Sequence, residues 1–317
     1  MLGFKQNNEI AYPVEVVTTL QDLMRYEFLV QSGSLLPKHP VYAILAGRHT
    51  SKLRGRGLDF EEVRQYVAGD DIRNIDWRVT ARTGKTHSKV FNEEKERPTF
   101  IVVDQSSFMF FGSQRFVKSV SAAHAAAVSA FYTIKRGDRV GGIVFNEEGY
   151  DYIAPKRSKA LVQHFLQTVV SRNKVLPLRK TVQANTSLLN TMLQRTQAAV
   201  THDYVITVIS DFSMIDEQTR QYLRNMSNHN DVILIHIYDL LDEKLPDGKL
   251  ILSDGKRQIA WQNSKNRWGA KYPKNFTDMR KTLTEEFDRY RIPMVFFNTT
   301  ETIEDQVMQS MGRLLRR

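Results

Sequence analysis

The chain has 317 residues, of which 41% are hydrophobic and 10% aromatic, so it is long and apolar enough to bury a substantial core. Its formal net charge of +10 favours an acidic partner, but the basic residues form short dispersed groups rather than a known nucleic-acid-binding motif. The absence of cysteine excludes disulfides, thiolate nucleophiles and zinc-thiolate sites.

The first residues, Met1 to Val17, lack the basic segment, apolar stretch and cleavage site of a secretory signal. No apolar run in the chain approaches the length that a bilayer span requires. We therefore expect a cytoplasmic protein without a transmembrane segment.

Residues 1–97 are predicted to contain an N-terminal helix and a small β-rich module. An amphipathic pattern predicts the helix over about residues 14–30. Further along, Ile75, Trp77 and Val79 alternate with polar residues, which predicts a half-buried strand. The glycine in Thr83-Gly84-Lys85 then suits a hairpin turn.

Residues 98–317 alternate between apolar runs and helical patterns, which predicts an α/β domain with a doubly wound, mostly parallel sheet. The alternation is interrupted at about 242–273 by an inserted segment, where Ser253-Asp254-Gly255 predicts an exposed hairpin. The predicted strands are 99–104, 139–145, 204–210, 231–238 and 292–298, and the predicted helices are about 116–134, 158–171, 186–199, 214–226, 273–290 and 302–316.

Two motifs suggest a phosphate-binding loop and a catalytic histidine, but the surrounding sequence favours neither. Gly84-Lys85-Thr86 looks like the end of a phosphate-binding loop, but Val79 stands where that loop needs its first glycine. His124 lies near the alanine-rich packing face of a predicted helix, which favours a core or interface histidine over a catalyst.

Oxygen-bearing side chains stand at several strand ends and helix starts. Asp104 ends the first predicted strand and Ser106 follows it, Thr186 opens a helix, and Asp211 follows the strand at 204–210. The carboxyl ends of neighbouring parallel strands form one crevice, so these side chains could converge there and suit Mg²⁺. Each of them also suits a helix cap, and that alternative stays open.

The segment 56–91 closely resembles a bacterial family catalogued as domain of unknown function 58. Its Gly-Asp-Asp-x-Arg-x-Ile-Asp-Trp core is matched at residues 69–77, and the following Ala-Arg at Ala81 and Arg82. The resemblance continues to the C-terminus. It implies a von Willebrand factor A-like domain behind a β-rich segment, and an association with MoxR-type AAA+ ATPases.

In von Willebrand factor A domains, a metal-ion-dependent adhesion site contains Asp-x-Ser-x-Ser followed by a distant Thr and Asp. The resemblance implies Asp104, Ser106, Thr186 and Asp211 as the corresponding ligands, with Mg²⁺ as the candidate cofactor. Phe108 replaces the second serine, so the site is degenerate.

The resemblance implies a non-enzymatic protein-interaction adaptor that works with a MoxR-type AAA+ ATPase and a client protein in protein assembly, maturation or stress handling. For partner binding we expect the basic hairpin residues Lys256 and Arg257 and the aromatic Trp261 to contribute. A nucleic-acid-associated protein, favoured only by charge, and a Mg²⁺-dependent phosphoester hydrolase using Asp104 and Asp211 are the alternatives.

Overall fold

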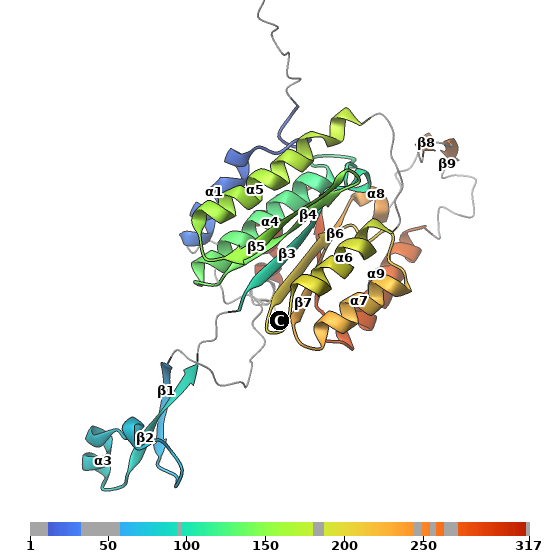
Figure 1. Cartoon of the computed structure of the whole chain (residues 1–317). Coiled ribbons are helices and arrows are strands. Elements are labelled where there is room, and N and C mark those ends of the chain that lie inside the picture. Colours follow the sequence, from blue (N-terminus) through green and yellow to red (C-terminus); the bar gives the residue numbers. More distant parts are fainter. Residues whose placement is uncertain are drawn as a thin grey trace, which may run out of the picture. The chain divides into compact units, whose positions relative to one another are not determined.

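The computed structural model of the chain divides into two compact units, one comprising residues 50–97 and the other residues 1–49 and 98–317 (Figure 1). Each unit has its own secondary structure. The structure describes residues 12–32, 58–93, 97–179, 187–243, 249–253, 258–262 and 272–314.

The larger unit is built on a six-stranded sheet with the strand order β10-β7-β6-β3-β4-β5. All neighbouring strands are parallel except β5, which pairs with β4 antiparallel. This confirms the predicted mixed α/β fold with a mostly parallel sheet. The strands are β3 (Thr99–Asp104), β4 (Val140–Asn146), β5 (Gly149–Lys156), β6 (Val205–Ser210), β7 (Asp231–Tyr238) and β10 (Met294–Asn298).

The order places a topological switch point between β3 and β6. From β3 the chain continues to β4 and β5 on one side of the sheet, whereas β6, β7 and β10 extend the other side. Ligands of open α/β sheets commonly bind outside the carboxyl ends of the strands at such a point. The ends of β3 and β6 are therefore the expected position of a binding site in this fold.

Helices cover both faces of the sheet, which explains why every residue of β3 and β6 is buried (Figure 1). Helix α4 is buried over most of its length, and its alanines allow close packing on the strands. The first face carries α1 (Leu20–Gln31), α4 (Lys118–Lys135), α5 (Lys159–Lys174) and α10 (Ile303–Leu314), and the second carries α6 (Leu188–Ala199), α7 (Glu217–Ser227) and α9 (Tyr272–Asp288). No helix of the described part of the chain is long and apolar enough to cross a membrane.

Helix α1 packs on the α/β unit, which differs from the predicted grouping of this helix with the β-rich module. The Tyr26 hydroxyl donates to Glu304 Oε2 at 2.7 Å and lies 3.1 Å from His124 Nδ1. Both Tyr26 and His124 are buried, as expected for a core histidine. The helix begins at Leu20, later than predicted, because Thr19 and Asp22 form a capping box there.

The smaller unit contains an antiparallel pair of strands, β1 (Leu58–Gln65) and β2 (His87–Glu93), with a 3-10 turn, Ile72–Asn74, and helix α3 (Trp77–Thr83) between them. The strand predicted through Trp77 and Val79 is wrong at this point. Asp76 caps a helix instead, since its Oδ1 accepts hydrogen bonds from the backbone N–H groups of Arg78 and Val79. Gly84, at φ 68°, ends that helix.

The predicted inserted hairpin is present as β8 (Lys249–Ser253) and β9 (Gln258–Gln262), which pair antiparallel after the short helix α8 (Leu240–Glu243). The backbone of Trp261 pairs with that of Leu250. Lys256 and Arg257 lie outside the described residues, so their predicted role in partner binding stays a prediction.

Candidate functional site

Asp104 and Asp211 lie at the carboxyl ends of two neighbouring strands, as the parallel topology predicts. Asp104 is the last residue of β3, and Asp211 follows the last residue of β6 directly. The carboxylates are 6% and 7% exposed, although aspartate is seldom buried without partners. Their surroundings therefore decide what the site can do.

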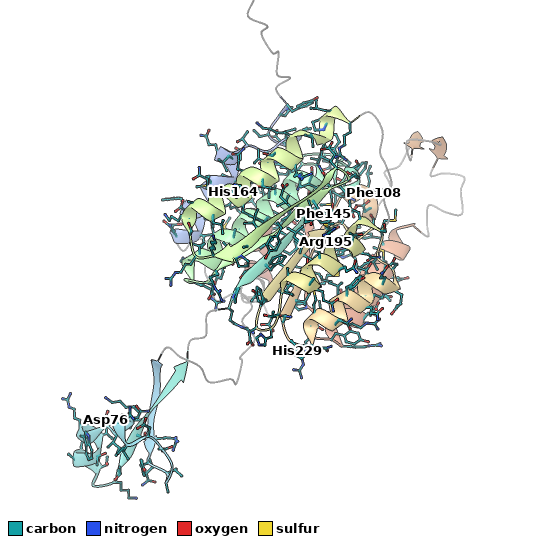
Figure 2. All side chains as sticks on the ribbon, in the orientation of Figure 1. Asp76, Phe108, Phe145, His164, Arg195 and His229 are labelled. Atoms are coloured by element: carbon teal, nitrogen blue, oxygen red, sulfur yellow. The ribbon has the colours of Figure 1, made fainter. Side chains whose placement is uncertain are left out.

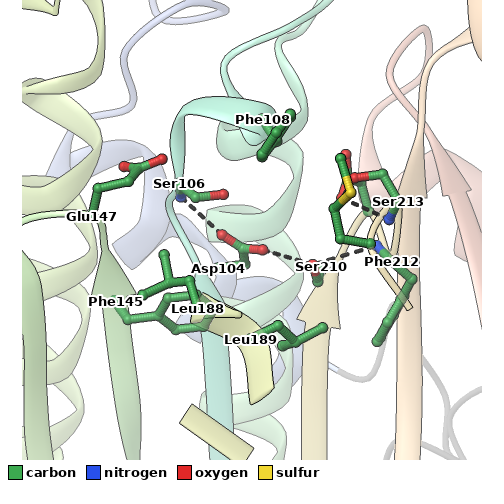
Figure 3. Close-up of a pocket in the computed structure, with 12 residues that line it drawn as sticks. Asp104, Ser106, Phe108, Phe145, Glu147, Leu188, Leu189, Ser210, Phe212 and Ser213 are labelled. Carbon is green, nitrogen blue, oxygen red and sulfur yellow. Dashed lines mark hydrogen bonds between the residues drawn. The ribbon is translucent and has the colours of Figure 1, made fainter. Parts of the chain in front are cut away.

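The Asp104 carboxylate has two close hydrogen-bond donors. Its Oδ1 accepts from the backbone N–H of Ser106 at 2.8 Å, and its Oδ2 accepts from the Ser210 hydroxyl at 2.7 Å (Figure 3). Burial raises the pKa of Asp104 to about 6, the neighbouring Asp211 adds to the rise, and the hydrogen bonds from Ser210 and Ser106 oppose it. Two carboxylates in this crevice thus repel each other without a compensating charge at Asp104.

The negative charge of Asp211 is compensated by a lysine that the sequence patterns do not identify. Lys118 Nζ, at the start of α4, lies 3.4 Å from Asp211 Oδ2 and 2.7 Å from Asp242 Oδ2. Burial alone would lower the pKa of Lys118, but the carboxylates of Asp211 and Asp242 outweigh burial and hold that pKa above its ordinary value. The ammonium group therefore stays charged. The other Asp211 oxygen accepts from the Ser213 backbone at 3.1 Å and from its hydroxyl at 2.9 Å.

A second ion pair borders the crevice beside β4. Glu147 accepts a hydrogen bond from the Ser107 backbone at 2.7 Å and forms an ion pair with Arg179. Arg179 also donates to the Ser107 hydroxyl at 3.3 Å. These contacts fix the loop after Asp104. Glu147 and Arg179 lie 40 and 72 residues from Ser107 in the chain, so no local sequence pattern could have connected them.

Two cavities flank Asp211. The smaller has a volume of about 30 Å³ and is lined by Asp104, Ser106 and Phe108 among others, which is room for water rather than for an organic ligand (Figure 3). The larger has a volume of about 310 Å³ and combines polar with apolar walls. Its lining residues are Lys118, Asp211, Ser213, His236, Asp242, Phe276 and Met279.

His236, in the wall of the larger cavity, is a buried histidine whose Nδ1 has no hydrogen-bond partner among the described residues. Its ring packs between aromatic side chains, with Phe296 at 5.3 Å and Phe212 at 5.9 Å between ring centroids. Burial lowers the pKa of His236 to about 4, Asp211 opposes the fall, and Lys118 and Arg280 add to it. At neutral pH the imidazole is uncharged.

Of the four predicted metal ligands, the structure brings Asp104, Ser106 and Asp211 together, whereas Thr186 lies outside the described residues. Phe108 lines the smaller cavity with them and offers no oxygen. The described residues fit a divalent cation poorly, because both carboxylates already accept hydrogen bonds and the Lys118 ammonium occupies one side of Asp211. Within that part of the chain, no three His, Cys, Asp or Glu side chains are grouped as a metal site.

Comparison with known proteins identifies relatives of this chain. An uncharacterized protein of Mycobacterium tuberculosis is 30% identical over 226 residues, which cover 71% of this chain and 69% of the relative. A protein of Mycobacterium bovis, also uncharacterized, is similar to the same extent, with 30% identity over 226 residues.

Two solved structures show limited similarity to this chain. One is the conserved hypothetical protein BatB from Bacteroides thetaiotaomicron, with a TM-score of 0.41, 11% identity, and coverage of 70% of this chain and all of the other. The second is an aerotolerance-related membrane protein from Bacteroides fragilis, with a TM-score of 0.41, 14% identity, and coverage of 68% of this chain and 99% of the other.

Residues 62–281 match the family described as "Protein of unknown function DUF58". This segment contains most of the β-rich module, the crevice and the inserted hairpin. The chain belongs to the DUF58 family.

Proposed function

We propose that this protein is a non-enzymatic interaction adaptor whose α/β unit is of the von Willebrand factor A type. Its partner in this proposal is a MoxR-type AAA+ ATPase, and the complex acts in the assembly, maturation or stress handling of a client protein. The family resemblance supports the partner by analogy. The sheet order, with one antiparallel edge strand and a crevice at the switch point, is compatible with that fold type.

The observation that carries the proposal is the position of Asp211 between the two cavities. Asp211 lines the smaller cavity together with Asp104, and it lines the larger cavity together with Lys118 and Asp242. Lys118 pairs with Asp211 and Asp242, and Asp104 has no cationic partner among the described residues, so the crevice favours a partner that brings a further positive charge. The larger cavity, with Phe276 and Met279 in its wall, has room for one large side chain.

In this proposal Lys118 supplies the positive charge that a divalent cation supplies in an intact adhesion site. It is held in the interior by two carboxylates, and its side chain is 7% exposed. This permanent ammonium group offsets the negative charge of Asp211 and Asp242 without a bound metal. The hydrolase alternative finds less support, because Asp211 is already engaged by Lys118 and Ser213 and is poorly placed to act as a free general base.

The test is binding of the full-length chain to the purified MoxR-type ATPase from the same genome, measured by surface plasmon resonance. Asp104→Asn and Asp211→Asn keep the side-chain shape and remove one charge each, and Asp288→Asn, at an exposed position, is the matched control. We expect either crevice substitution to weaken binding about tenfold. Absence of a complex, or equal affinity for all three variants, contradicts the proposal.

A further inference from the structure

The β-rich module carries a helix whose outer side is aromatic and basic. Trp77, the first residue of α3, is 70% exposed. Arg78 and Arg82, one helical turn apart, are exposed beside it, and Lys85 follows the helix. We call Trp77, Arg78, Arg82 and Lys85 the α3 basic face.

Hydrogen bonds to β2 hold the opposite side of the helix. Asp76, which is labelled in Figure 2, caps the helix. It donates its backbone N–H to the His87 carbonyl at 2.9 Å. The His87 N–H in turn donates to the Thr80 hydroxyl at 3.0 Å, and Val79 and Thr80 are partly buried. The α3 basic face is therefore presented to solvent by an anchored helix rather than by a mobile loop.

The α3 basic face carries positive charge that the described carboxylates of this module do not neutralise. Three carboxylates of the module have cationic partners: Asp70 with Arg64 at 2.6 Å, Asp71 with Arg73 at 3.7 Å and Asp76 with Lys89 at 3.7 Å. Arg78, Arg82 and Lys85 have no carboxylate partner among the residues that the structure describes. An exposed tryptophan beside unpaired arginines is the composition of an interface hot spot.

We propose that the α3 basic face binds an acidic surface of a protein partner. Charge complementarity identifies the occupant, since three cations without a described carboxylate partner accompany one large exposed apolar side chain on this short segment. Two other exposed apolar residues of the module, Val67 at 59% and Ile72 at 67%, suit protein contacts better than phosphate contacts. The inference goes beyond the proposed function, because it concerns a different unit and does not depend on the crevice.

The experiment measures binding of the full-length protein to a fluorescein-labelled amphipathic peptide of glutamate and leucine, about 20 residues long so that it can form a helix. Fluorescence anisotropy is recorded at about 0.15 M salt. We expect Arg78→Glu combined with Arg82→Glu, and separately Trp77→Ala, to weaken binding about tenfold. The matched control reverses two exposed charges in the other unit, Lys174→Glu with Arg289→Glu, and should weaken it about twofold or less. A peptide with lysine in place of glutamate should bind the Arg78→Glu, Arg82→Glu variant better than the wild type.

Several results would overturn the proposal. One is the absence of peptide binding, and another is equal weakening by the two charge-reversed pairs, which would reflect net charge alone. Tighter binding of a single-stranded oligonucleotide or of phosphatidylglycerol vesicles through Arg78 and Arg82 would assign the face to another class of partner. Finally, a variant that retains Trp77 as its one tryptophan, with Trp261→Phe and Trp268→Phe, should be readily quenched by acrylamide before peptide is added. Protection in the free protein would mean that the chain itself covers this face.

Discussion

Lys118 Nζ lies 3.4 Å from Asp211 Oδ2 at the carboxyl edge of the sheet, and each of the two side chains is 7% exposed. Removing one partner of a buried ion pair leaves the other charge uncompensated, which commonly costs several kcal/mol. This contact is therefore both a structural feature of the crevice and the origin of its charge pattern.

The first prediction concerns stability. Lys118→Met removes the ammonium group and keeps much of the apolar stem, so it should lower the free energy of unfolding by about 3 kcal/mol. Urea unfolding at pH 7 measures the change. Lys281→Met is the control, because Lys281 is 74% exposed in its ion pair with Glu285 and such pairs contribute little. Equal effects of the two substitutions would show that the Lys118 contact is energetically unimportant.

The second prediction is a loss of stability in mild acid. Burial lowers the pKa of His124 to about 4 and that of His236 to about 4, from an ordinary value of 6.5. Between pH 4 and pH 6.5 these two histidines bind protons in the unfolded chain but not in the folded chain. Each histidine therefore contributes stability that is fully present above pH 6.5 and is lost as the pH falls toward 4, by up to about 3 kcal/mol. Asp104, whose folded pKa is raised to about 6, contributes in the opposite direction over this range and offsets part of that loss.

The pH dependence can be assigned with single variants. His124→Gln should lessen the loss between pH 7 and 4 by up to about 3 kcal/mol, measured as the change in unfolding free energy across that range. The same substitution at the exposed His164 removes an imidazole from solvent rather than from the interior and serves as the control (Figure 2). An unchanged pH profile in His124→Gln would exclude His124 as a contributor.

The third prediction concerns the attachment of α1. Tyr26→Phe removes the hydroxyl that donates to Glu304 and lies beside His124, and it leaves the ring to fill the same space. We expect the substitution to lower the free energy of unfolding by about 1 to 2 kcal/mol. It should also accelerate amide hydrogen exchange more in α1 than in β3. Uniform acceleration across the unit would instead indicate that α1 is not separately held by this hydroxyl.

The fold was predictable from the sequence where burial is continuous. The strands β3 and β7 have the predicted bounds, because covered parallel strands form uninterrupted apolar runs. The edge strand β5 was not predicted, because it has no continuous apolar run and only Ile153 among its residues is buried. The segment from Ile75 to Val79 was predicted wrongly, because the alternation there does not reflect burial. Trp77 points to solvent, and capping by Asp76 selects a helix.

The site was predictable only in part, because some of its contacts follow from the strand topology and others depend on the tertiary fold. Asp104 and Asp211 could be placed together because the ends of adjacent parallel strands meet in any sheet of this type. Lys118 could not be added, since it follows Asp104 by 14 residues at the start of a helix, where a lysine ordinarily faces solvent. The pairing of Glu147 with Arg179 likewise depends on the tertiary fold.

The fourth prediction concerns metal binding. Phe108→Ser restores the hydroxyl that the degenerate adhesion site lacks, but Lys118 remains beside Asp211. We therefore expect calorimetric titration of Mg²⁺ and Mn²⁺ into chelator-treated protein to show no binding to either the wild type or Phe108→Ser. Binding gained on Phe108→Ser would show that the missing hydroxyl, and not the ammonium group, was the obstacle. Tight binding by the wild type would contradict the proposed role of Lys118 outright.

The proposed function requires the crevice at the ends of β3 and β6 to bind the MoxR-type ATPase. The most direct measurement is amide hydrogen exchange of the full-length chain alone and in complex with the MoxR-type ATPase. We expect slower exchange in the complex for residues 105–113, which follow Asp104, and for residues 211–216, which begin with Asp211. Protection restricted to other segments, with these two unchanged, would contradict it.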